Sequence, residues 1–322
     1  MGIRLFECLS EIKGKLPHLQ DLQLRIWGTQ KSKLDFFEDA PRLVAVNYSG
    51  AVSLVPGLPW GTLRSFTYNG GDKDLGAVFA LMSRCAPTTV FQLRRLDLSR
   101  QSDALDIAPT TASTASLILS IGVPSSPERA SDILGEILDS LTLPALCYLR
   151  LRPTFDARPL HWPTPAFLAF LTRSACTTSL TFLELDAVIS LDALVRCLST
   201  LPALKTLFLA DPRSTHSPNL TDALFRCLAL VPDGDQASFL VPRLGCLRCT
   251  TRMRFKEAIF LAFVRSRAEV RRHGRTRPFE VEVSWFGGAQ RGFGAGTRTA
   301  LMEMVREGEV VLAITPYTAA PV

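Results

Sequence analysis

A short apolar pattern recurs along this chain and constrains its fold more than any other feature. In its fullest form, over Leu201–Leu209, it reads Leu-Pro-Ala-Leu-Lys-Thr-Leu-Phe-Leu. Copies with the proline stand at Leu16–Leu24, Leu143–Leu151 and Val241–Cys249, and copies without it at Gln92–Leu98 and Ser179–Leu185. Such self-similarity is the sequence signature of a solenoid, in which stacked units share one continuous core.

Each copy has the physical character of a short strand. Its Leu-x-Leu end alternates apolar and polar residues, which is typical of a strand buried on one face. The proline favours extended backbone and ends any helix that precedes it. One unit cannot bury its apolar face alone, whereas stacked units can, with their strands paired in parallel. We therefore predict an α/β fold: a parallel sheet of short strands with helices on its outer face.

The copies also predict how many units the chain holds. Their first consensus leucines stand at positions 19, 43, 63, 93, 146, 180, 204 and 244. The interval from Leu93 to Leu146, 53 residues, is about two units long, and a hidden copy at Ser116–Ile121 would divide it. With further hidden copies near 276 and 309, we expect about eleven strands. We interpret residues 1–314 as one irregular repeat domain and residues 315–322 as a tail.

Helices are predicted on the return paths between the strands. Apolar residues at helical spacing indicate helices over residues 1–15, 34–40, 73–86 and about 297–306. Four other helices have residues at their start that favour capping of an N-terminus: Ser131, Thr164 (before Pro165), Ser190 and Thr221. Strand, loop and helix therefore alternate along the chain.

Composition excludes several broad classes. The chain has 322 residues, 47% of them hydrophobic and 20% charged, which suits a large packed core and not a disordered or collagen-like chain. No apolar run approaches the ~18 residues of a membrane-spanning helix, and the start lacks the apolar region of a signal peptide. The eight cysteines are scattered, and we interpret them as reduced thiols. We therefore expect an intracellular protein, cytoplasmic or nuclear, with no membrane partner.

The strands and the helices between them resemble the leucine-rich-repeat region of fungal F-box proteins. The resemblance covers roughly residues 16–314. It rests on the combination of Leu-Pro-x-Leu-x-x-Leu-x-Leu strands with helices such as Pro165–Cys176, and on Phe263–Arg267 before a strand and a final helix. It implies a horseshoe-shaped leucine-rich-repeat solenoid. It also implies the substrate-recognition part of a cullin-type ubiquitin ligase, which would hold a partner protein on its concave face.

Two departures from this family bear on function. The Asn or Cys usual three residues after the last strand leucine is absent, and that slot holds Trp27, Gln101, Thr154, Val188 and Pro212. We therefore expect no buried asparagine ladder, and irregular loops on that side of the sheet. No F-box precedes the repeats, so the resemblance implies a substrate-recognition part without its ligase-recruiting part. We expect this chain alone not to bind the ligase adaptor.

Three motifs suggest other chemistry, and each has a plainer interpretation. Cys246-x-x-Cys249 lacks the second ligand pair of a zinc site, so we interpret both as strand cysteines. The Gly-rich segment 292–296 lacks the lysine and the spacing of a phosphate loop. Six arginines between Arg265 and Arg277 have no interleaved aromatic residues for stacking on bases, so we do not expect nucleic-acid binding. We interpret them as a solvated helix end, with a localisation or partner-binding patch as the alternative. We expect no cofactor and no metal.

The alternate residues of the strands remain as the candidate binding surface. In a parallel solenoid these residues line the concave face, and arginine and aromatic side chains are enriched at binding hot spots. The candidates are Gln23, Arg25, Arg95, Asp97, Tyr148, Arg150, Arg152, Glu184, Asp186, Phe208 and Arg248.

Two classes of function fit such a chain. The first is a protein–protein interaction module, which is not an enzyme and has a partner protein of unknown identity. The second is an α/β enzyme, hydrolase-like or nucleotide-binding, with degenerate motifs. Such an enzyme would gather its catalytic residues at strand ends around one pocket. Strands at repeat spacing, without a nucleophile elbow or phosphate loop, favour the first class.

Overall fold

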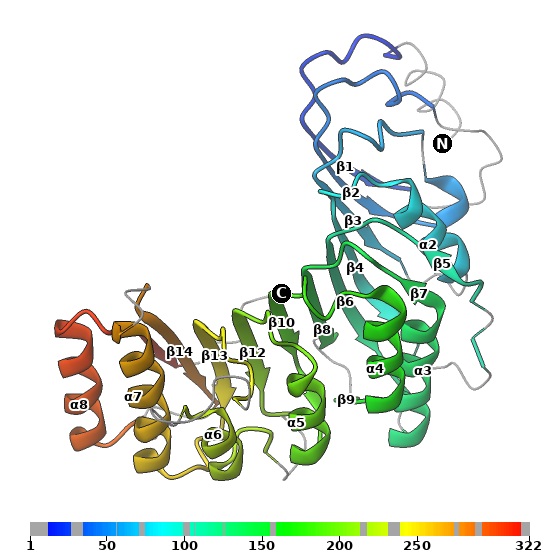
Figure 1. Cartoon of the computed structure of the whole chain (residues 1–322). Helices are drawn as coiled ribbons and strands as arrows, with labels where there is room; N and C mark the ends of the chain where they lie inside the picture. Colours follow the sequence, from blue (N-terminus) through cyan, green and yellow to red (C-terminus); the bar gives the residue numbers. More distant parts are fainter. Residues whose placement is uncertain are drawn as a thin grey trace. The chain divides into compact units, whose positions relative to one another are not determined.

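Eleven strands form one sheet whose order follows the chain, in a computed structural model of the protein (Figure 1). Every strand pair whose register is described is parallel, so the expected α/β class and parallel sheet are confirmed. The structure describes residues 12–26, 35–55, 57–70, 75–98, 104–105, 107–124, 126–154, 159–212, 218–230, 239–273, 277–286 and 292–316. The chain divides into two compact units, which we call unit 1 (residues 1–158 and 165–176) and unit 2 (residues 159–164 and 177–322).

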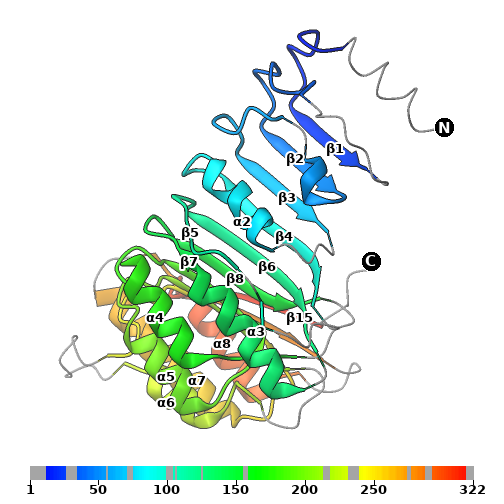
Figure 2. The same ribbon diagram turned by 90° about the vertical axis from the view of Figure 1, so that its right-hand side faces the viewer.

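Unit 1 contributes six strands of the sheet, with helices on one of its faces (Figure 2). The strands are β1 (Asp21–Arg25), β2 (Ala45–Ser49), β3 (Ser65–Asn69), β4 (Val90–Asp97), β6 (Ser116–Gly122) and β8 (Tyr148–Pro153). The helices are η1 (Val52–Leu54, a 3₁₀ turn), α2 (Leu75–Arg84), α3 (Pro127–Ser140) and α4 (Thr164–Ser174). A small second sheet pairs β5 (Thr110–Thr111) with β7 (Leu141–Thr142).

Unit 2 repeats the same arrangement with five strands, again with its helices on one face. The strands are β10 (Phe182–Leu185), β12 (Thr206–Ala210), β13 (Cys246–Thr251), β14 (Phe279–Trp285) and β15 (Val310–Pro316). The helices are α5 (Leu191–Ser199), α6 (Asp222–Leu228), α7 (Glu257–His273) and α8 (Ala295–Arg306). A two-stranded sheet pairs β9 (Leu160–His161) with β11 (Ala187–Val188).

The strand register aligns the apolar ends of the repeats into continuous rows. One row holds Leu22, Val46, Phe66, Phe91, Leu117 and Leu149 in unit 1, and Leu183, Leu207, Leu247, Val281 and Leu312 in unit 2. All are buried except Leu22 and Leu312, which lie on the edge strands and are half-buried. The hidden copies expected near 116, 276 and 309 correspond to β6, β14 and β15. Because successive side chains of a strand point to opposite faces, this row faces the helices and forms the core.

One copy of the pattern lies in a different phase from the prediction. Leu93 was expected as the first consensus leucine, ahead of the strand, but it lies in the middle of β4 and pairs with Tyr68 and Leu119. The register then shifts between Leu93 and Leu96, which is a β-bulge. Arg94 and Arg95 occupy the bulge and are both exposed. The sequence pattern gave the wrong phase here because Leu93 and Leu96 are both buried. A bulge within the strand separates them, whereas the pattern assumes that the first leucine precedes the strand.

Helix boundaries follow capping chemistry at two of the four predicted caps, and Thr164 is the first residue of α4 instead of the residue before it. Ser190 and Thr221 cap α5 and α6 as predicted, because their hydroxyl oxygens accept hydrogen bonds from Ala193 N and Leu224 N. Ser131 does not cap α3, since it lies inside that helix. Ser126 is the cap, accepting from Arg129 N at 3.3 Å, and Pro127 follows at the first helical position. Ser126 and Pro127, which precede Ser131 in the chain, therefore start the helix in place of the predicted cap.

The helix predicted over residues 34–40 does not appear as such. Residues 36–39 form hydrogen-bonded turns, in which Glu38 N donates to Asp35 O and Ala40 N donates to Phe37 O. Most of the helix predicted over residues 1–15, namely residues 1–11, lies outside the described residues. The tail predicted from residue 315 begins within β15, and residues 317–322 lie outside the described part.

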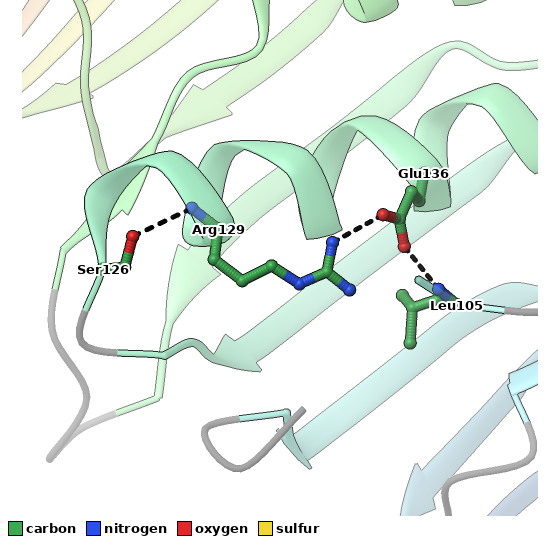
Figure 3. A network of polar contacts seen from close by, with 4 residues as sticks. All are labelled: Leu105, Ser126, Arg129 and Glu136. Atoms are coloured by element: carbon green, nitrogen blue, oxygen red, sulfur yellow. Dashed lines mark hydrogen bonds and ion pairs between the residues drawn. The ribbon is translucent and has the colours of Figure 1, made fainter. Parts of the chain in front are cut away.

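A polar network ties the segment after β4 to helix α3 (Figure 3). Arg129 Nη1 donates to Glu136 Oε1 at 2.6 Å, and the other oxygen of this carboxylate accepts from Leu105 N at 2.6 Å. The side chains of the ion pair are 18% and 27% exposed. One carboxylate therefore anchors a long connection on the helical side of the sheet.

Candidate functional site: the polar face of the sheet

The face of the sheet opposite the helices is the candidate functional surface. We call it the polar face, and it is made by the alternate residues of each strand, those between the buried apolar residues. On β1 the alternation places Asp21, Gln23 and Arg25 on this face, all exposed. The same alternation on the other strands defines a surface in each unit, so the predicted site residues can be placed one by one.

In unit 1, the predicted residues of β1 and β8 lie on the polar face. Gln23 and Arg150 belong to the same register row across the sheet, with β2, β3, β4 and β6 between them. On β8, the guanidinium carbon of Arg150 lies 6.0 Å from the centre of the Tyr148 ring, a cation–π distance. Arg152 Nε donates to Ser120 Oγ at 2.9 Å. The face is thus organised by contacts within and between neighbouring strands.

The predicted residues of β4 are displaced from the expected positions. Because of the bulge, Arg95 has a backbone φ of 59° and does not occupy a regular alternate position. Asp97 returns to the polar face, opposite Gly122 of β6. The regular polar-face residues of β4 are instead Gln92 and Arg94, and Gln92 Oε1 accepts two hydrogen bonds from the Arg94 guanidinium. The alternation of buried Phe91 and Leu93 was the signal that could have located them.

In unit 2, three of the four predicted residues lie side by side. Glu184, Phe208 and Arg248 are direct neighbours across β10, β12 and β13. The row continues to Glu282 of β14, whose carboxylate forms an ion pair with Arg248 at 3.2 Å. Glu184 is 6% exposed, and Asp186 follows the end of β10. Glu282 was not among the predicted site residues, although the alternation of Phe279–Val283 indicated its strand. Its position beside Arg248 follows only from the register between β13 and β14.

The geometry of β13 explains the Cys-x-x-Cys motif. Residues three apart on a strand point to opposite faces. Cys246 accordingly shares a register row with Glu280 on the polar face, whereas Cys249 lies in the core between Leu209 and Val283. Burial raises the pKa of both thiols, that of Cys249 most strongly. The two are strand cysteines, as predicted, and their sulfurs do not converge on one ligand position. In the part of the chain that the structure describes, no group of three or more His, Cys, Asp and Glu could hold a metal ion.

The arginines between Arg265 and Arg277 have separate roles, and at least one of them is not solvated. Arg267 is 1% exposed, and its guanidinium donates to three backbone oxygens, of Leu228, Leu240 and Val241. Burial lowers its pKa to about 10. Arg271 also donates to backbone oxygens, and Arg272 forms an ion pair with Glu309 at 2.8 Å. The interpretation of the cluster as a solvated helix end is therefore wrong for Arg267, because its guanidinium is buried and satisfies backbone carbonyls of α6 and of residues 240–241.

In the Gly-rich segment 292–296, the backbone N–H of Gly294 binds the carboxylate of Glu257. Gly294 is the N-cap residue of α8, and its backbone N lies 3.0 and 3.1 Å from the two carboxylate oxygens of Glu257. A helix N-terminus attracts anions, and here the anion is a side chain of α7. The contact joins α7 to α8.

A buried polar network lies after β12 and is built around Asn219 and Asp211. Asn219 Nδ2 donates to the backbone oxygens of Ala187 and Ala210, at 2.6 and 2.7 Å. Asp211, 1% exposed, accepts from Asn219 N and Leu220 N on one oxygen, and from Thr251 Oγ1 and Arg252 N on the other. Asn219 stands nine residues after the last residue of β12, outside the slot that the family uses. A single asparagine at this place is not a ladder, so it does not contradict the expectation that the ladder is missing.

Compared with known proteins, the sequence matches no family model and no curated protein. No helix among the described residues is long and apolar enough to cross a membrane. By its structure the protein is an α/β protein with a parallel eleven-stranded sheet. In each unit the helices cover one face of the sheet, and the other face is polar (Figures 1 and 2).

Proposed function

We propose that this chain is a leucine-rich-repeat solenoid that binds a partner protein on the polar face of its sheet. The observation that carries the proposal is the composition of that face. Each strand presents alternate residues opposite its helices, and they include arginine, tyrosine and phenylalanine, the types enriched at interface hot spots. Arg150 over Tyr148, and Phe208 between Glu184 and Arg248, are the two groups of this kind. A broad surface with such groups suits a protein partner.

The resemblance to F-box proteins makes the proposal more specific. We infer that the chain acts as a substrate-recognition part of a cullin-type ubiquitin ligase and that it does not itself bind the ligase adaptor. In this function the partner is the protein to be ubiquitinated. A pull-down with purified adaptor tests the second statement, and a stable complex between the adaptor and this chain would contradict it.

Site-specific photo-cross-linking tests where a partner protein binds. A photoreactive residue is placed on the polar face at Gln23 in unit 1 and at Phe208 in unit 2. The matched control positions are exposed residues on the helices of the same units, Ser83 of α2 and Arg226 of α6. We expect defined cross-linked species from the polar-face positions alone. Equal or stronger cross-linking from the helix positions would overturn the proposal.

A further inference from the structure

One row of side chains crosses the polar face of unit 1 near the carboxyl ends of its strands. In order across the sheet its members are Arg25, Ser49, Asn69, Arg94 with Arg95, Ser120 and Arg152. We call these seven residues the arginine row. Four of them are arginines, the other three are small hydrogen-bonding residues, and none is acidic. The row therefore has the chemistry of a surface for negatively charged groups.

The bulge in β4 doubles the positive charge at the middle of this row. Between the pairs Leu93–Leu119 and Leu96–Ile121, two residues of β4 oppose the single residue Ser120. The second of them, Arg95, has a φ of 59°, a conformation that costs free energy for any residue except glycine. Bulges commonly re-aim side chains near functional sites, and strained backbone clusters at such sites. A strained bulge at the centre of a basic row is an independent indication of use.

Two arginines of the row are held by hydrogen bonds before any ligand arrives. Arg94 donates from Nε and Nη2 to Gln92 Oε1, at 3.2 and 2.9 Å, which uses two of the five N–H groups that a guanidinium carries. Arg152 donates from Nε to Ser120 Oγ at 2.9 Å. Ordering a long side chain in advance lowers the entropic cost of binding. The row is in this sense preorganised.

The spacing of the arginines matches an extended peptide that lies across the strands. Adjacent strands are ~4.8 Å apart, so Arg25 and Arg94 are about 14 Å apart, and Arg94 and Arg152 about 10 Å. An extended chain advances ~3.3 Å per residue, so these intervals correspond to about four and about three residues. Carboxylates at those intervals can each meet one guanidinium, the partner with which arginine makes its strongest hydrogen bonds. The row holds no aromatic residue for stacking on bases, which disfavours a nucleic acid.

We propose that the arginine row binds an extended acidic segment of a partner protein, with Asp or Glu side chains three and four residues apart. The proposal rests on the proposed function, because it names the chemistry of the partner that the polar face holds. The segment crosses the strands of unit 1, and its carboxylates contact Arg25, the Arg94–Arg95 pair and Arg152.

Fluorescence polarisation with the full chain tests the proposal. The probe is a labelled peptide of about ten residues, longer than the ~24 Å row at ~3.3 Å per residue, with glutamates at the stated intervals in a Gly/Ser background. The test variant is Arg25→Glu/Arg94→Glu. The matched control is Arg42→Glu/Arg64→Glu, which changes the net charge equally at two exposed arginines of unit 1 near the amino ends of β2 and β3. We expect a Kd about tenfold or more higher for the test variant, and within about twofold of the parent for the control.

Arg95→Gly gives a second variant that does not depend on charge reversal. Glycine accepts the backbone conformation of the bulge, so this variant should keep or raise the Tm while it weakens peptide binding. Equal loss of binding in both double variants would overturn the proposal, as would equally tight binding of a peptide with lysine in place of glutamate. Tighter binding of a single-stranded oligonucleotide that competes with the peptide would also overturn it. Photo-cross-linking from Gln23 without any peptide binding would reject the acidic segment while leaving the proposed interaction module intact.

Discussion

Replacing Asp211 with alanine removes the acceptor at the centre of the buried network after β12. Its carboxylate accepts four hydrogen bonds, from Asn219 N, Leu220 N, Thr251 Oγ1 and Arg252 N, at 2.8, 3.0, 2.8 and 3.1 Å respectively. Three of these donors are backbone N–H groups that cannot rotate toward another partner. A buried donor left unsatisfied costs about 1–3 kcal/mol, so we expect a loss of about 3–5 kcal/mol in the free energy of unfolding.

The assay separates this effect from a general loss of stability. Urea denaturation measures the free energy of unfolding, and hydrogen exchange read by mass spectrometry locates the change. We expect faster exchange in β12 and β13, with unit 1 unchanged. Asp211→Asn keeps one acceptor but turns an amide N–H toward Arg252 N. We therefore expect a loss of unfolding free energy that is measurable but smaller than the loss in Asp211→Ala.

Asp222→Ala is the matched control in the same unit. Its carboxylate accepts one hydrogen bond, from Lys256 N, in an exposed position, so we expect a loss below about 1 kcal/mol. If Asp211→Ala costs no more than this control, the network does not hold the turns of unit 2 together and the reasoning is refuted.

Three further predictions follow from the core, the bulge and the thiols. Leu207→Ala should cost about 2–5 kcal/mol of unfolding free energy in a denaturant titration, because Leu207 is fully buried at the centre of unit 2; an unchanged midpoint would contradict its place in the core. Arg95→Gly should stabilise the chain by about 0.5 kcal/mol, since relief of the φ strain slightly exceeds the extra entropy of glycine in the unfolded chain; a clear loss of stability would show that the bulge is not strained. Burial raises the pKa of Cys85 to about 12, so at pH 8 its thiol stays protonated, and alkylation followed by mass spectrometry should modify the exposed Cys227 first.

Local patterns in the sequence were enough to place the strands of the eleven-stranded sheet. The Leu-x-Leu alternation located the strands because one face of each strand must be buried whatever its neighbours are. Ser190 and Thr221 were predicted as caps because a cap satisfies N–H groups within its own first turn. Even the weak copies near 276 and 309 became strands, since alternation alone marks them. The polar-face residues Gln23, Arg150 and Arg248 were found by the same local rule.

Three features of the structure, the bulge, the burial of Arg267 and the links made by Asn219, depend on contacts between residues that are distant in the sequence. The bulge at Arg95 arises from the register between β4 and β6, which no local pattern specifies. The sequence predicts Arg267 as a solvated helix residue, but it is buried, and its guanidinium donates to backbone carbonyls of α6 and of residues 240–241. Asn219 links β11 and β12 because its side-chain amide donates to a backbone oxygen of each strand. The sequence by itself determined which residues alternate between core and surface, through local periodicity. The fold decided which surface residues become neighbours, because register and loop path are set by the packing of the whole unit.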